Sequence, residues 1–434
     1  MSKPEQDYIL QDLLQELNKC AKCGACQSVC PIFDQSKREP DAARGKIALI
    51  QARAAGELPC SQEYANILQN CLLCLACEQV CSSSVSMHTV VLRARQELVS
   101  QKGLSWKRRQ MHSLLQGRSR KLKALFQAGA LVQCLLLKRV PEESGLRLRF
   151  PLPGLDQDQL LPRLALRPFR DRYPQRFGSR EQELKVVFFT GCASNYLLPE
   201  IGESLLKVLD ALGVGVDIPK SQSCCGAPVL AAGDRQGCIS LAEKNLQTLG
   251  KLDPEARVVV CCASGGFMLK QIYPELLRDR PALLEQARDL AARTLDISQY
   301  LVQVIGLQKL KAKIVSPCSI STTFHDPCHL VRGQGVQSEP RRLLEICCPG
   351  HFQEMQDADS CCGLGGTYAV THKDMSQRIR QQKLDNIYKA QAGQVVTGCP
   401  ACMLQLRAGL QQKLPRVQVR HTIQVLSRAM GLEE

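Results

Sequence analysis

The chain has 434 residues, 44% of them hydrophobic, which is enough for two to four domains with cores of their own. Its 24 cysteines are therefore more than stability requires. The formal net charge of +15 is a weak indication of nucleic acid, because aromatic residues make up only 4% and the basic residues are scattered. We expect no nucleic-acid partner.

The first twenty residues are polar and amphipathic, without the apolar run and small-residue cleavage site of a signal peptide. They predict a cytoplasmic protein, in which clustered thiols bind metals or carry out redox chemistry rather than form disulfides. No stretch reaches the roughly 18 apolar residues that span a bilayer. The apolar run 125–137 has basic flanks, so two interpretations stay open: a buried helix, or peripheral association with the inner face of the cell membrane.

Two cysteine runs near the N-terminus share one spacing. Two, two and three residues separate the cysteines of "CAKCGACQSVCP", and the spacing returns after 40 residues in "CLLCLACEQVCSS". This duplication is typical of two-cluster ferredoxins, in which three cysteines of a run hold one 4Fe-4S cube and the fourth reaches the other. The predicted ligands are Cys20, Cys23, Cys26 and Cys81 for the first cluster and Cys71, Cys74, Cys77 and Cys30 for the second.

Zinc is the competing interpretation of these thiols. Zinc sites usually show paired C-x2-C units, which do not explain three cysteines followed by a fourth.

The tight loops also need small residues such as Gly24, Ala25 and Ala76. Two clusters that share ligands in this way lie close together, so the pattern predicts an electron relay.

Strands and helices alternate from about residue 184. The segment "KVVFFTGCAS" predicts a strand that ends in Cys192, "VGVDIP" a strand that runs towards "SCCGAP", and "ARVVVCCASGG" a strand that enters Cys261 and Cys262. Between the first two, "GESLLKVLDALG" predicts a helix closed by Gly213. The cysteines follow the predicted strands, at the sheet edge where open α/β folds bind ligands. Glycines behind each Cys-Cys pair are expected to let the backbone approach a bulky inorganic group.

The cysteines of this part form an internal repeat. Between the single cysteine and the Cys-Cys pair lie 31 residues in the first copy (Cys192 to Cys224) and 32 in the second (Cys328 to Cys361). In both copies 36 residues separate the pair from a later cysteine of the repeat, which is Cys262 in the first copy and Cys399 in the second. Agreement over two copies indicates duplicated structural units.

This arrangement resembles the CCG cysteine-rich domain of heterodisulfide reductase, lactate-utilisation proteins and related oxidoreductases. The resemblance implies that the second copy holds a non-cubane iron-sulfur cluster through five cysteines, namely Cys328, Cys361, Cys362, Cys399 and Cys402. The first copy has Gly265 or Gly266 in place of the last cysteine. Its candidates are Cys192, Cys224, Cys225 and Cys262, which leave an altered cluster, a zinc ion or a metal-free scaffold open.

The order of these parts resembles the iron-sulfur subunits of glycolate oxidase, as do the phrases "PDAARGKIALI", "FHDPCHL" and "CCGLGGTYAVTHKDM". The resemblance implies partner subunits that bind FAD and oxidise glycolate to glyoxylate, and a quinone or membrane acceptor. This chain shows no G-x-G-x-x-G behind a strand, so we expect no dinucleotide site of its own. Subunits of a D- or L-lactate or glycerol-3-phosphate dehydrogenase, or a heterodisulfide reductase-like enzyme, are the alternatives.

The expected fold is α+β overall. A helical two-cluster ferredoxin domain occupies 1–105 and a basic helical linker 106–183, followed by two repeated α/β CCG modules, a degenerate one at 184–310 and a complete one at 320–430. His325 and His329 flank Cys328, and two roles stay open for them: tuning or covering a cluster, or a solvated loop position.

Overall fold

The computed structural model describes residues 10–106, 109–110, 124, 127–131, 133, 137–139, 146–148, 164–178 and 184–433. Most of the linker, and much of the apolar run 125–137, lies outside the described residues. Within these ranges no helix is long and apolar enough to cross a membrane. The chain forms two compact units: a first unit of Met1–Ser113, Gly226–Ser240 and Ser360–Gln382, and a second of Leu114–Cys225, Leu241–Asp359 and Lys383–Glu434.

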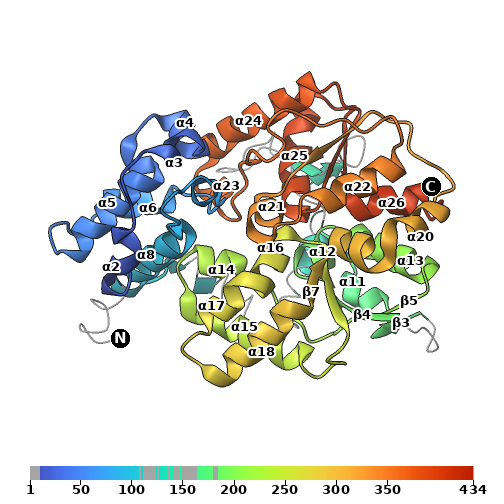
Figure 1. Cartoon of the computed structure of the whole chain (residues 1–434), viewed down its shortest axis with the longest axis horizontal. Helices are drawn as coiled ribbons and strands as arrows, with labels where there is room; N and C mark the ends of the chain where they lie inside the picture. Colours follow the sequence, from blue (N-terminus) through green and yellow to red (C-terminus); the bar gives the residue numbers. More distant parts are fainter. Residues whose placement is uncertain are drawn as a thin grey trace. The chain divides into compact units, whose positions relative to one another are not determined.

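The first unit is helical in its described part (blue in Figure 1 for its N-terminal segment). Its N-terminal segment contains α2 (Leu14–Asn18), α3 (Ala25–Ser28), α4 (Pro31–Ser36), the 3-10 helix η1 (Glu39–Asp41), α5 (Ala43–Ala54), α6 (Gln62–Gln69), α7 (Ala76–Gln79) and α8 (Met87–Lys102). The later segments add α14 (Ala227–Ala231), α23 (Tyr368–Thr371), the start of α15 (Arg235–Leu249) and the first part of α24 (Lys373–Lys389).

Local signals explain where these short helices begin. The Ser61 hydroxyl accepts the Tyr64 N–H at 3.1 Å and caps α6. Pro31 occupies the first turn of α4, where its missing N–H costs nothing. The long helices pack around a core that includes Leu17, Ile50 and Leu68.

A second, smaller core joins distant parts of the chain in the first unit. Ile32 and Leu72 pack there with Tyr368 and Ile379, which come from the segment after the second Cys-Cys pair. The hydroxyl of Tyr368 donates to Asn70 Oδ1 at 2.7 Å. Segment 360–382 is therefore an integral part of the first unit.

The second unit contains two sheets that are largely parallel (Figure 1). The larger has the order β3-β5-β4-β6-β7, with only the edge strand β3 antiparallel. Its strands are β3 (Arg176–Phe177), β4 (Leu184–Phe189), β5 (Val214–Asp217), β6 (Arg257–Val260) and β7 (Thr294–Asp296). The smaller sheet, β10-β9-β8, consists of β8 (Thr322–His325), β9 (Gln394–Thr397) and β10 (Gln418–His421). A separate hairpin pairs β1 (Leu137–Arg139) with β2 (Leu146–Leu148).

Helices connect these strands. In the larger sheet's half they are α11 (Phe169–Arg172), α12 (Ala193–Tyr196), α13 (Pro199–Ala211), α16 (Ala263–Phe267), α17 (Tyr273–Leu276), α18 (Pro281–Arg293), α19 (Ile297–Tyr300) and α20 (Leu307–Ala312). Two π-helical turns, η3 (Met268–Ile272) and η4 (Leu301–Gly306), lie among them. The smaller sheet's half has α21 (Cys328–Gln334), α22 (Ser338–Cys347), α25 (Pro400–Lys413) and α26 (Thr422–Ala429).

The predicted fold class is confirmed: a helical N-terminal part precedes two α/β repeats. Parallel strands with buried side chains, such as Phe188 in β4 and Val259 in β6, form where apolar runs predict them. The domain boundaries at 105, 184 and 320 stay a prediction. The compact units do not follow them, because segments 226–240 and 360–382 pack with the first unit.

Candidate metal centres

Two cavities of the first unit are lined by the cysteines of the two runs. Cys20, Cys23, Cys26 and Cys81 line one of them. Cys71, Cys74, Cys77 and Cys30 line the other. The cavities adjoin, because Cys77 lines both. Each predicted ligand set thus surrounds one space, with the fourth thiol supplied by the other run.

The loops between the cysteines repeat one backbone conformation. Lys22 and Leu73 have φ of 57° and 55°, and Gly24 and Leu75 have φ of 85° and 64°. Left-handed residues at the same two positions turn each loop tightly around its cavity. Leu75 takes the position of Gly24 at a cost of roughly 1 kcal/mol, which is typical of a left-handed non-glycine residue.

Backbone N–H groups point at several of the sulfur atoms. Cys30 Sγ accepts from Phe33 N at 3.5 Å, and Cys81 Sγ accepts from Val85 N at 3.4 Å. The main-chain N–H of Arg44 donates to Cys26. Such hydrogen bonds favour the thiolate over the thiol and raise the reduction potential of a bound cluster.

Burial disfavours the ionised form of cysteines that line the same two cavities. It raises the pKa of Cys26, Cys30 and Cys77, and neighbouring cysteine thiolates raise the pKa of Cys77 further. These thiols are therefore protonated without metal, and binding a cluster must release protons.

The segment between the two runs supplies a cation to each cavity. Arg44, whose Nη1 donates to Lys22 O at 3.1 Å, lines the first cavity, and Lys46 lines the second. The Lys46 side chain is only 2% exposed. Desolvation lowers the pKa of Lys46, while Cys71 and Cys30 raise it. Neither residue was predicted to belong to a site, although both stand in the phrase "PDAARGKIALI".

The repeat cysteines lie at strand ends in the second unit. The thiols of Cys192 and Cys224, which follow β4 and β5, are hydrogen-bonded. Cys262 behind β6 is hydrogen-bonded to Cys399 behind β9, and Cys399 is also hydrogen-bonded to Cys402. The hydrogen bond with Cys399 and burial raise the pKa of Cys262, whereas donation from Cys262 and Cys402 lowers the pKa of Cys399. Thiols of the two modules are therefore in direct contact.

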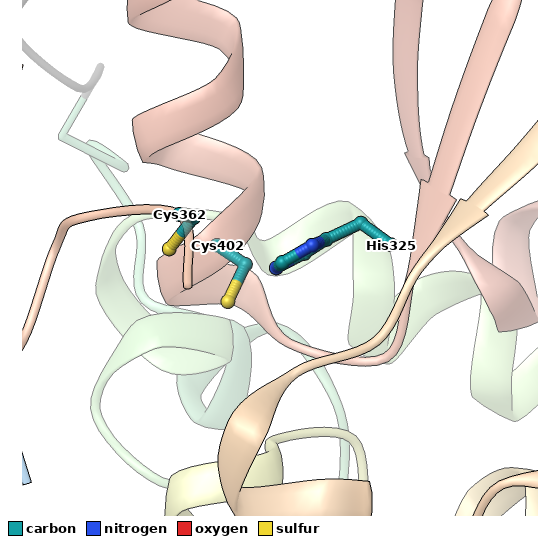
Figure 2. Close-up of side chains that lie close together, drawn as sticks. All are labelled: His325, Cys362 and Cys402. Atoms are coloured by element: carbon teal, nitrogen blue, oxygen red, sulfur yellow. The ribbon is translucent and has the colours of Figure 1, made fainter. Parts of the chain in front are cut away.

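A histidine belongs to one of the cysteine groups. The ligand atoms of His325, Cys362 and Cys402 lie within 4.8 Å of one another, and all three residues are buried (Figure 2). His325 ends β8, and Cys402 lies in the first turn of α25. One nitrogen and two sulfur donors suit zinc or iron. The sequence analysis noted His325 only for its place beside Cys328.

Three of the five cysteines predicted for the second module, Cys328, Cys361 and Cys399, lie outside this group of ligand atoms within the described residues. Cys361 packs instead against the small core of the first unit, together with Cys30 and Cys74. Cys328 begins α21 and is half-buried. Whether these five residues ligate a metal together stays a prediction.

Two glycines stand where the first module lacks its last cysteine. Gly265 stands three residues after Cys262, as Cys402 does after Cys399. A Cβ atom on the adjacent Gly266 would lie 2.5 Å from Oε1 of Gln334 in α21. Gln334 Nε2 in turn donates to Ala263 O at 2.9 Å. Gly266 thus makes room for a side chain of the second module, whereas a Cβ atom on Gly265 would make only ordinary contacts, the nearest at 3.5 Å.

The comparisons with known proteins agree with these centres. Residues 16–85 match the family described as 4Fe-4S dicluster domain, and residues 186–270 and 322–407 match the family described as Cysteine-rich domain. The chain is therefore an iron-sulfur protein of the dicluster type with two cysteine-rich domains. A probable glycolate oxidase iron-sulfur subunit from Bacillus subtilis is 30% identical over 427 residues, which cover 96% of this chain and 94% of the relative. The chain belongs to the family of glycolate oxidase iron-sulfur subunits.

Other relatives have different names. One subunit of the fumarate reductase (CoM/CoB) of Methanothermobacter marburgensis is 28% identical over 98% of this chain and 74% of its own length. Lactate utilization protein A 2 of Bacillus cereus is 29% identical over 57% of this chain and its own full length. The fold is similar to that in a crystal structure of a hypothetical protein from Helicobacter pylori, with a TM-score of 0.54. The superposition covers 99% of this chain and 77% of the Helicobacter chain. At 9% sequence identity the likeness shows the fold alone. The family places the chain among iron-sulfur subunits of oxidoreductase complexes.

Proposed function

We propose that this chain is the electron-transfer subunit of a glycolate oxidase complex. It takes electrons singly from a partner subunit, where FAD oxidises glycolate to glyoxylate, and passes them towards a quinone-linked acceptor at the membrane. The observation that carries the proposal is the pair of adjoining cavities, each lined by one predicted set of four cysteines drawn from both runs. The nearly full-length similarity to a glycolate oxidase subunit supports the choice of glycolate.

The cysteine residues fit the proposed clusters. Four thiols, mainly from left-handed loops, face each cavity, and a 4Fe-4S cluster bound there would supply one-electron chemistry. The chain's own residues set the conditions for that chemistry. Apolar side chains such as Ile32 and Met87 exclude water from the second cavity, and Lys46 places a positive charge beside Cys30 and Cys71.

Iron analysis tests the cofactor part of this proposal. Two 4Fe-4S clusters carry about eight iron and eight sulfide atoms per chain, and a further cluster in the cysteine-rich domains would raise that number. The protein is purified without oxygen, and its iron, sulfide and zinc contents and the EPR spectrum of its reduced form are measured. A colourless protein containing only zinc would contradict the proposal.

An assay with the native complex tests the substrate. We expect glycolate to reduce the clusters of this chain when the flavoprotein subunits are present, and not when they are absent. D-lactate, L-lactate and glycerol 3-phosphate are compared in the same assay. Turnover of lactate without turnover of glycolate would replace the proposed substrate, and the similarity to a lactate utilization protein makes this the main alternative.

A further inference from the structure

A third cavity of the first unit, of about 310 Å³, adjoins the second cysteine set. Its walls come from α6, α8, the end of α14 and the segment 365–371. Cys71 lines this cavity as well as the cavity of the second cysteine set. A molecule bound here would therefore touch a predicted cluster ligand. This acceptor cavity, as we name it, is large enough for a single small ring compound.

The lining of the acceptor cavity combines apolar and polar groups. Its apolar part is formed by Ala65, Leu98, Val99, Leu104, Ala231 and Ala232. The neutral polar residues include Gln69 and Thr367, and the described lining contains no carboxylate. An uncharged ring with two carbonyl groups can pack against the apolar part while its oxygen atoms face the polar part.

Two cationic side chains, Arg95 and Lys102, give the cavity a positive potential, and both donate hydrogen bonds to main-chain carbonyl groups. Arg95 is 7% exposed, and its guanidinium donates to the carbonyl oxygens of Leu68 at 3.0 Å, Gln69 at 3.1 Å, Cys71 at 2.8 Å and Ala231 at 2.8 Å. Lys102 Nζ donates to a main-chain carbonyl at 3.1 Å. These charges favour an acceptor that becomes more negative as electrons reach it.

The mouth of the cavity has the composition of a surface that meets lipid. Lys102, Gly103 and Ser105 are exposed lining residues, and Trp106 follows them with 71% of its surface exposed. Trp106 is the single tryptophan of the chain, and Arg109 lies shortly beyond it. An exposed tryptophan among basic residues is typical of a membrane interface.

We propose that the acceptor cavity binds a quinone and reduces it through Cys71. This inference rests on the proposed function, because the electrons come from the flavoprotein subunit. A cluster held by the second cysteine set would supply two electrons, one at a time, to the ring, and water at the mouth would supply two protons. The two carbonyl groups of the quinone become the two hydroxyl groups of the quinol.

Menadione, a quinone without a long tail, provides the test. Full-length protein with its clusters is titrated with menadione while the emission of Trp106 is recorded, and we expect saturable quenching. Separately, dithionite-reduced protein is mixed with menadione, and the reoxidation of the clusters is followed by visible absorbance. Ala232→Phe, which fills the cavity, is expected to weaken binding and slow reoxidation about tenfold or more.

Controls separate the cavity from general effects. Ala55→Phe adds the same ring at an exposed position outside the cavity and is expected to behave like the parent protein. Leu104→Asp places a carboxylate in the lining and is expected to have the same effect as Ala232→Phe. It replaces that variant if Ala232→Phe lacks the parent's iron content and EPR spectrum.

The outcomes distinguish this inference from the proposed function. If a correctly loaded cavity variant keeps the parent's quenching and reoxidation rate, the quinone does not bind in the acceptor cavity. If menadione neither quenches Trp106 nor reoxidises the parent protein, the acceptor is not a quinone and the inference is wrong. In both cases reduction of the clusters by glycolate and the flavoprotein would still support the relay.

Discussion

The Lys46 ammonium group donates to the main-chain carbonyl of Asp41, and both residues are buried. This contact holds a cation beside Cys30 and Cys71, in the wall of the second cavity. An iron-sulfur cluster becomes more negative on reduction, so a nearby buried cation stabilises the reduced form. The first cavity has Arg44 in a more exposed position, so the two cations act with different strength.

We expect Lys46→Met to lower the reduction potential of the cluster bound by Cys71 and its partners. At an effective dielectric constant of about 20, one charge removed at about 8 Å changes the potential by roughly 50–100 mV. EPR-monitored redox titration measures both clusters in one sample. Lys46→Arg keeps the charge and is the matched control. Unchanged potentials in Lys46→Met would show that the ammonium group does not influence the cluster.

Gly45, next to Lys46, is predicted to be essential for the stability of the first unit. A Cβ atom there would lie 2.1 Å from the main-chain oxygen of Glu39, which cannot move without shifting η1. Gly45→Ala should therefore destabilise the first unit by about 3 kcal/mol or more and reduce its iron content. Gly213→Ala is the control, because its φ of 75° costs only about 1 kcal/mol and a Cβ atom meets nothing within 4 Å. Equal melting temperatures for Gly45→Ala and the parent would contradict this prediction.

The loop that carries Cys328 depends on a buried ion pair. Arg341 in α22 contacts Asp326 through two hydrogen bonds of 3.0 and 2.6 Å, and the Asp326 side chain is 1% exposed. Arg341→Met leaves this carboxylate without its cation, at an expected cost of about 3–5 kcal/mol. Lys37→Met, which removes an exposed pair with Asp34, should cost less than about 1 kcal/mol.

A double-mutant cycle isolates the contribution of this pair. Asp326→Asn combined with Arg341→Met removes both charges, so we expect the double variant to lose clearly less stability than the sum of the two single losses. Unfolding by urea provides the three values. Additive losses would indicate that Asp326 and Arg341 act independently.

Asp296 predicts a pH dependence of stability. Its Oδ1 accepts the Ser298 N–H at 2.8 Å, and Oδ2 has no hydrogen-bond partner among the described residues. Burial raises the pKa of Asp296 to about 7. Because this value lies above that of the unfolded chain, the carboxylate destabilises the fold only when it is ionised. The penalty is absent below about pH 4, grows up to about pH 7 and stays constant above it.

Asp296→Asn removes this penalty and keeps the carbonyl that accepts from Ser298. We expect the variant to gain more stability over the parent at pH 8 than at pH 5, by about 2 kcal/mol. Urea unfolding at the two pH values measures the difference. Asp210→Asn, at an exposed position, is the control and should show no such change. The same gain at both pH values would mean that Asp296 does not titrate in this range.

Much of this architecture follows from local patterns in the sequence. The spacing of the two runs predicted which thiols share a cavity, because three cysteines in one tight loop have little freedom to be elsewhere. The strands β4 and β6 were predicted from short apolar runs between helices. Cysteines at their carboxyl ends then follow from parallel pairing.

Other features depend on contacts between distant residues. Leu75 adopts a left-handed conformation that its residue type does not indicate, because its loop must match the loop of Gly24. The small core places Tyr368 against Leu72, although almost three hundred residues separate them. The pairing of Cys262 with Cys399 likewise depends on how two repeats pack. Single-sequence periodicity carries no information about such pairs.

The composition of the first unit has a consequence for biosynthesis. Ile32 and Leu72 are made early, but the core in which they lie is complete only when Tyr368 and Ile379 have left the ribosome. During translation the loop of Cys71 and Cys74 therefore lacks part of its apolar cover. Insertion of the cluster that we propose for this cysteine set, in its final environment, must wait until nearly the whole chain has been synthesised.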